Sequence, residues 1–154
     1  MEQAPRRDEA VRKGPLSQMG WVKDRLTNYP QFTPKLWDEL KDSIGVAVME
    51  FNDSTSNAAD NHLEAKDCTS MGKYCRRVSK AYGAVSVEVF LDEATKMLKI
   101  APDVSICGYR IRPDRAAAEF FKDTPEGPFG IPVEEACRMA IEEFIFKPLS
   151  KPSA

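Results

Sequence analysis

The stretch that decides the predicted fold is residues 69–91, which read TSMGKYCRRVSKAYG and then AVSVEVFL. Apolar residues in its first part recur at the spacing of an amphipathic helix, and cationic residues fill the remaining positions. After Gly83 the period changes to two, because Val85, Val87 and Val89 alternate with other residues. The pattern predicts a cationic helix over residues 69–83, docked beside a sheet.

Two further strands are predicted downstream of strand 84–91. A turn at residues 92–96 leads into a strand at residues 97–101, and a second turn leads into a strand at residues 104–112. Short apolar segments separated by turn residues are typical of an antiparallel meander.

Two helices and one strand are predicted upstream of the cationic helix. Residues 15–28 and 33–44 carry apolar stripes at helical spacing, and Pro15 and Pro34 stand where helices commonly begin. Residues 45–51, GVAVMEF, are apolar at almost every position, which favours a strand in the interior of a sheet.

Two helices are predicted near the end of the chain. The first covers residues 113–121, a proline-stiffened loop follows at residues 124–130, and the last and most regular helix begins at Pro132 and ends near Lys147. The predicted order is α-α-β-α-β-β-β-α-α. This is an α+β fold with about four mostly antiparallel strands and five helices in two or three layers.

The expected domain organisation is one α+β domain over residues 15–148. Residues 1–14 are charged and nearly free of large apolar groups, which predicts a flexible N-terminal arm, and residues 149–154 are expected to fray. A chain of 154 residues can bury one core of this kind.

Composition narrows the class of protein. The formal net charge of −2 argues against a protein that coats nucleic acid with its whole surface. No apolar run is long enough to span a membrane, and residues 1–10 lack the features of a secretory signal. The four cysteines are scattered with no Cys-x-x-Cys pair, as in proteins of reducing compartments. We therefore expect an intracellular protein, cytoplasmic or nuclear, that does not associate with membranes.

The candidate binding surface consists of clustered cations and one aromatic residue on a loop. Four of the cations lie on the predicted cationic helix and three near the end of strand 104–112, while the aromatic residue could be a docking knob. Together they are predicted to bind a protein partner or single-stranded nucleic acid. The residues are Lys73, Arg76, Arg77, Lys80, Arg110, Arg112, Arg115 and Phe129.

Catalytic and metal-binding patterns are weak. His62 is the only histidine, and no serine or cysteine stands in a recognisable nucleophile motif. His62 lies in residues 52–67, a segment rich in Asn, Asp, Ser and Ala that predicts a long exposed loop. We predict no catalytic residue, metal or cofactor. Ser79 follows Arg76-Arg77-Val78 as in a basophilic kinase site, but a serine within a helix is the simpler interpretation.

The leading hypothesis is a non-catalytic interaction protein, a subunit or adaptor of an intracellular assembly whose partner is another protein or a second copy of the chain. It would use the basic helix face and the proline-stiffened loops. One alternative is a small RNA-binding module that uses the same cations. Another is a small enzyme with a site around the 52–67 loop and His62.

Overall fold

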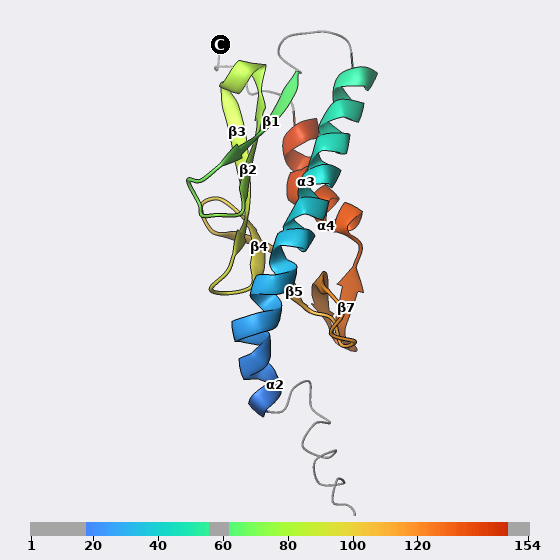
Figure 1. Ribbon diagram of the computed structural model, residues 1–154. Coiled ribbons are helices and arrows are strands. Elements are labelled where there is room, and N and C mark those ends of the chain that lie inside the picture. The colour runs from blue at the N-terminus through green and yellow to red at the C-terminus, as the bar shows by residue number, and fades with distance from the viewer. Residues whose placement is uncertain (1–17, 56–61, 148–154) are drawn as a thin grey trace, which may run out of the picture.

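The computed structural model describes residues 18–55 and 62–147, and Figure 1 shows their arrangement. A long helical segment begins the described chain, a seven-stranded antiparallel sheet follows, and a second helix ends it. This corrects the expected four strands and five helices. The arm predicted at residues 1–14, the tail at 149–154 and residues 56–61 lie outside the described residues. The long loop predicted at residues 52–67 is wrong at both ends, because residues 52–54 are helical and residues 63–67 belong to a strand.

The N-terminal helical segment is continuous where two helices were predicted. It consists of α2 (Gln18–Lys23), the π-helical turn η1 (Asp24–Asn28) and α3 (Tyr29–Ser54). The N–H of Tyr29 donates to the carbonyl of Asp24, five residues back. Proline in a regular α-helix clashes with the carbonyl four residues back, and a π-turn widens the helix locally. The wide turn directly before Pro30 accommodates this proline, near which the first helix was expected to end, and Pro34, expected to begin the second helix, lies inside α3.

The strand predicted at residues 45–51 is also wrong, because these residues belong to α3. Ile44 and Val48, one helical turn apart, are buried, whereas Val46 and Met49 are exposed. A short run of apolar residues fits a buried strand and a helix equally well. Burial of every fourth residue distinguishes the two here.

The sheet is a simple meander in which each strand pairs with the next one in the chain. The predicted strands at residues 84–91, 97–101 and 104–112 coincide with β3, β4 and β5. The strands are β1 (Leu63–Cys68), β2 (Cys75–Lys80), β3 (Val85–Asp92), β4 (Met97–Ile100), β5 (Val104–Ile111), β6 (Ala118–Thr124) and β7 (Gly127–Ile131).

The cationic helix predicted at residues 69–83 is wrong, because its centre forms β2 and residues 81–83 form the 3₁₀ turn η3 (Ala81–Gly83). β2 pairs with β1 on one side and β3 on the other. Val78 in its middle is fully buried against the helical layer. Val78 opposes Ala65 on β1 and Val87 on β3, and this pairing on both sides outweighed a helical spacing that the local sequence also allowed.

The helix predicted at residues 113–121 is wrong for a similar reason. Its last four residues, 118–121, begin β6, residues 113–117 form the connection before it, and β6 makes a hairpin with β7 within the segment expected to be a loop at 124–130. Phe120 pairs with Tyr109 of β5, and both side chains are almost completely buried. Phe120 is therefore buried by packing against the neighbouring strand and not along one face of a helix.

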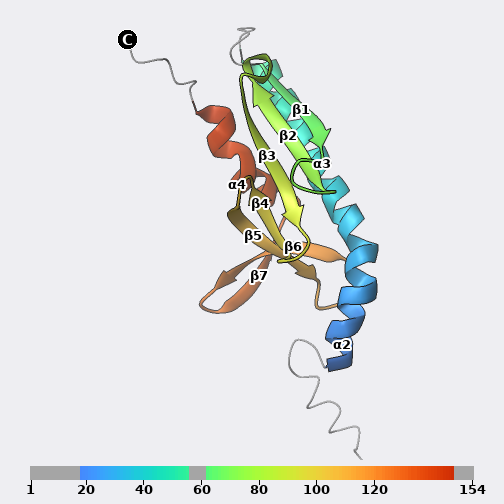
Figure 2. The ribbon, with the colours of Figure 1, turned by 90° about the vertical axis from the view of Figure 1, so that its left-hand side faces the viewer.

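The last helix, α4 (Val133–Phe146), lies where the sequence predicted it. It packs on the same face of the sheet as α3, so the described residues form two layers (Figure 2). α3 reaches across much of the sheet, because both β1 and β6 contact this helix. The core between the layers includes Leu40, Ile44, Val78, Val89, Leu98, Phe120, Ala140 and Ile141.

Within residues 18–55 and 62–147, we find no helix that has both the length and the apolar character needed to cross a bilayer.

Candidate functional site

Two adjoining hollows between α3 and α4 form a groove, which we call the α3–α4 groove. Their volumes are about 500 and 290 Å³, and they share Ser43, Val46 and Glu134 among their lining residues. The helices contact each other directly, so the groove is a depression along their seam. Volumes of this size are in the range of ligand and peptide pockets.

The walls of the groove are largely apolar. Val46 and Ala47 come from α3, and Ile141 and Ile145 from α4. At one end the ring of Phe146 lies edge-on to that of Phe51, with 5.7 Å between their centroids. Val46 is 51% exposed and Phe146 is 67% exposed. Large apolar side chains that stay this exposed beside a hollow are typical of a contact surface.

The charged side chains that line the groove are mostly acidic: five carboxylates stand against one guanidinium. The guanidinium of Arg138 is already paired, at 2.8 Å from Glu135 and 3.5 Å from Glu142. Within the described part of the chain, the other four lining carboxylates form no ion pair. These four are Glu39, Asp42, Glu50 and Glu134.

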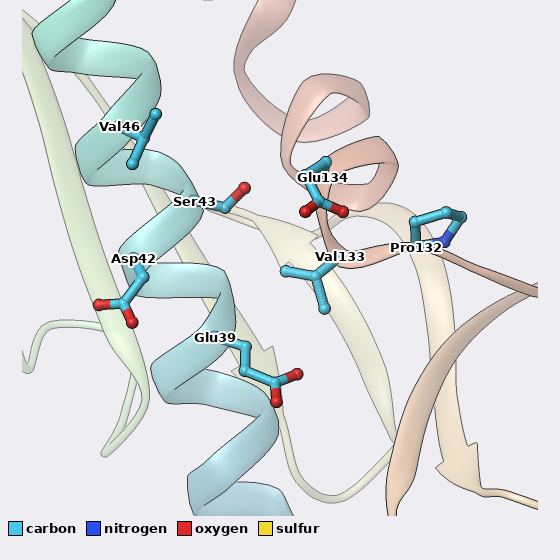
Figure 3. A pocket seen from close by; sticks show the side chains of 7 residues that line it. All are labelled: Glu39, Asp42, Ser43, Val46, Pro132, Val133 and Glu134. Carbon is cyan, nitrogen blue, oxygen red and sulfur yellow. The ribbon is translucent and has the colours of Figure 1, made fainter.

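Figure 3 shows how the first hollow is built. The side chains of Ser43 and Glu134 point toward each other across the gap between the helices, and Val133 points toward α3, whereas Asp42 points away from α4. Deeper in the seam, burial raises the pKa of the Cys137 thiol, and a hydrogen bond with Ser43 partly opposes the shift. The thiol is therefore protonated and contributes a small apolar surface.

The cations predicted on a helix lie on β2 and the loop before it. Arg76 bonds to Asp67 at 2.7 Å, and Arg77 bonds to Glu88 at 2.6 Å. They are consecutive strand residues, so their side chains leave opposite faces of the sheet. Lys80 is buried and donates to the carbonyl of Lys147 at 2.5 Å, just past the end of α4.

Lys80 therefore has a structural role, since a cation is stabilising at the C-terminus of a helix. Its Nζ also lies 5.0 Å from the ring centroid of Phe144. Lys73, in the loop before β2, lies over the ring of Tyr74 at 5.3 Å from the centroid.

The other three predicted cations line one small hollow of about 200 Å³, together with Asp24 and Tyr29. Each of them bonds to a carboxylate at 2.6–2.8 Å: Arg110 to Glu119, Arg112 to Asp114, and Arg115 to Asp24.

Two strands, β3 and β4, separate this hollow from β2. At the usual strand spacing the two groups of cations are at least about 14 Å apart across the sheet. The structure thus brings three of the seven cations together and keeps the others on β2 and its loop.

The remaining residues singled out in the sequence are exposed or structural. Phe129 lies on β7 and is 55% exposed. His62 is exposed, and its ring stacks on Tyr82 with 6.1 Å between centroids. Ser79 is a buried residue of β2 and not part of a helix. In the described residues, no three His, Cys, Asp or Glu side chains gather as metal ligands would.

Sequence reasoning missed the α3–α4 groove because half of it was assigned to the wrong element. Residues 45–51 were expected to form an interior strand, which would bury Val46 and leave no helix face beside α4. The usable signal was the acidic character of both helices, with Glu39 and Asp42 on one and Glu134 and Glu142 on the other. It became a site only when the fold placed the two helices side by side.

Comparison with known proteins adds no relative: neither a protein family, nor a curated protein, nor a solved structure matches the chain.

Proposed function

We propose that this chain is a non-catalytic protein-interaction domain, a subunit or adaptor, whose α3–α4 groove binds a cationic amphipathic helix of a partner protein. The observation that carries the proposal is the combination of exposed apolar side chains in the groove with carboxylates that have no cationic partner among the described residues. A helix with an apolar stripe and flanking lysines or arginines is complementary to both features.

Apolar and charged residues of the groove would contribute to binding in different ways. Burial of Val46 and Phe146 under a partner's apolar stripe would supply affinity, since each is at least half exposed in the described structure. The surrounding acids would supply orientation and a fast, salt-sensitive association. The groove runs beside α4, whose 14 residues span about 21 Å, so a partner helix of three to four turns fits it.

RNA binding through the predicted cations has less support. Five of the seven have a carboxylate within hydrogen-bonding distance, and Lys80 is buried against α4. The carboxylate beside each of these arginines neutralises much of its charge, which offsets most of the attraction that counterion release provides.

The test is fluorescence anisotropy with a labelled helical peptide of about 14 residues, built from leucine at helical spacing with lysine on both flanks. A peptide with glutamate at every lysine position is the charge control. We expect the lysine peptide to bind and the glutamate peptide not to bind. The affinity of the lysine peptide should fall as the salt concentration is raised.

Groove variants locate the binding. The double variant Glu50→Lys/Glu134→Lys should weaken binding about tenfold or more, whereas Glu126→Lys, in the β6–β7 turn, should leave it unchanged. If the double variant binds the lysine peptide as tightly as the wild-type protein does, the proposal is wrong.

Two other occupants are distinguishable in the same assay. If residues 1–17 cover the groove, Arg12→Glu/Lys13→Glu in the full chain will raise the peptide's affinity. If a second copy covers it, light scattering will give a dimer that Val46→Asp dissociates.

A further inference from the structure

Two thiols face each other at the loop end of the β1–β2 hairpin. Cys68 and Cys75 are the last register pair of these strands, directly before the loop of residues 69–74. Their side chains lie on the face of the sheet away from the helices, because Ala65 and Val78, on the alternate positions of β1 and β2, pack against the core. The two cysteines are therefore cross-strand neighbours on one face.

The spacing of such a pair suits a covalent bond. Opposed residues of antiparallel strands have Cα atoms about 4.5–5.5 Å apart, which is within the range of about 4.4–6.8 Å found in disulfides. The loop that joins them is a defined turn, in which the N–H of Gly72 donates to the carbonyl of Thr69 at 3.2 Å. Gly72 has a φ of 127°, a conformation that favours glycine. This turn reverses the chain direction and thereby places the two cysteines opposite each other.

The two thiols differ in their access to solvent. Cys75 is only 2% exposed, and its Sγ lies 4.0 Å from the hydroxyl of Ser70. Burial and a hydrogen bond with Cys68 raise the pKa of Cys75 to about 11, so it is protonated at neutral pH. Cys68 is partly exposed and is the thiol that a soluble oxidant reaches first.

We propose that Cys68 and Cys75 form a reversible oxidation site whose substrate is a hydroperoxide. In the first step, the Cys68 sulfur attacks the peroxide, its O–O bond breaks, and a sulfenic acid and water form when hydrogen peroxide is the oxidant. In the second step, the Cys75 sulfur attacks the Cys68 sulfur, the S–O bond breaks, and the Cys75 proton leaves with the hydroxyl group as water. Two thiols are oxidised and one peroxide is reduced to two waters.

The site differs from the other two cysteines of the chain. Cys107 and Cys137 are buried, and both pack in the core between the sheet and the helices. They are not register partners, since Cys107 opposes Leu98 and Cys137 belongs to α4. The disulfide would tie the base of the loop that carries Tyr74, whose ring lies 6.1 Å from that of Trp37 in α3.

The experiment treats the reduced full-length protein with hydrogen peroxide, blocks remaining thiols with N-ethylmaleimide, and maps the products by mass spectrometry. We expect a mass lower by two hydrogen atoms, one cross-linked peptide joining Cys68 and Cys75, and reversal by dithiothreitol. Before oxidation, Cys68 should react with the maleimide about tenfold or more faster than Cys107.

Variants separate the pair from general oxidation. Cys68→Ser should abolish the cross-link, and Cys107→Ser should leave it intact. In Cys75→Ser, the sulfenic acid of Cys68 should persist long enough to be trapped by dimedone. Conversion of wild-type Cys68 to sulfinic acid, or a cross-link between two chains in place of the internal one, overturns the proposal.

Discussion

The sheet and the α3–α4 groove carry charge in different ways. On the sheet, Arg77 and Glu88 are register partners, as are Arg110 and Glu119, and each pair is joined by an ion pair of 2.6 or 2.8 Å. Arg76 and Asp67 form a third such pair between β2 and β1. In the groove, acids come from two helices, and the single lining cation, Arg138, is paired within its own helix.

The difference shows that register decides which charges remain available. Cross-strand neighbours have Cβ atoms about 5 Å apart, so opposite charges on facing positions meet without any further adjustment. Helix faces meet only along a seam, and four of the carboxylates there have no ion-pair partner among the described residues. The arginines of a strand can therefore be neutralised by carboxylates on neighbouring strands, whereas the carboxylates of the groove keep their negative charge available to a partner.

The largest expected effect comes from a buried carboxylate of the N-terminal helical segment, in η1, which pairs with an arginine between β5 and β6. The carboxylate of Asp24, with a side chain only 5% exposed, accepts from Asn28 at 2.7 Å and from Arg115 at 2.6 Å. Asp24→Ala should cost about 2 kcal/mol, because two charge-assisted hydrogen bonds are lost and Asn28 stays buried. Urea unfolding measures the loss. The control Asp114→Ala, at an exposed pair, should change stability by less than about 0.5 kcal/mol.

A smaller effect is expected at a half-buried register pair. A double-mutant cycle with Arg110→Gln and Glu119→Gln should give a coupling free energy of about 0.5–1 kcal/mol. Arg110 also lies over the ring of Phe121, 5.2 Å from its centroid, so the single Arg110 variant should lose more than the single Glu119 variant. A coupling free energy of zero would mean that the two side chains do not stabilise each other, although strand register places them opposite one another.

The third prediction concerns pH. Lys99 lies 2.8 Å from Asp92 and holds the pKa of that carboxyl down at about 2, below its usual value near 3.8. The depressed pKa means that the stabilisation is complete above about pH 4 and is lost as pH falls through 2. Asp92→Asn should remove this part of the acid sensitivity, on the order of 0.5 kcal/mol after solvent screening. Urea midpoints between pH 4 and pH 2 measure it, and equal slopes in both proteins would contradict it.

The smallest effect is expected in the groove. Glu50 has no ion-pair partner among the described residues, so Glu50→Gln should leave the unfolding free energy within about 0.5 kcal/mol of wild type. The same variant should weaken binding of the lysine peptide. A clear loss of stability would mean that the acid holds the fold together and is not available to a partner.

The sequence predicted the strands β3, β4 and β5 and the helix α4, where apolar period and turn residues agree. The prediction failed at residues 69–83, where the apolar residues fit both the period of a helix and that of a strand. It also failed at a proline, because proline occurs at the first position of a helix and is sometimes tolerated inside one. Pro34 lies inside α3. The cations of the predicted surface were identified by type, but their carboxylate partners depend on strand register.

What the sequence by itself determined is the α+β composition, the central meander and the regular C-terminal helix, because these follow from local periodicity and residue type. Only the tertiary structure decided that residues 75–80 are a central strand, that α3 continues through its prolines, and that α3 and α4 lie side by side. Each of these depends on partners distant in sequence, and packing against them outweighs the small local preferences between helix and strand.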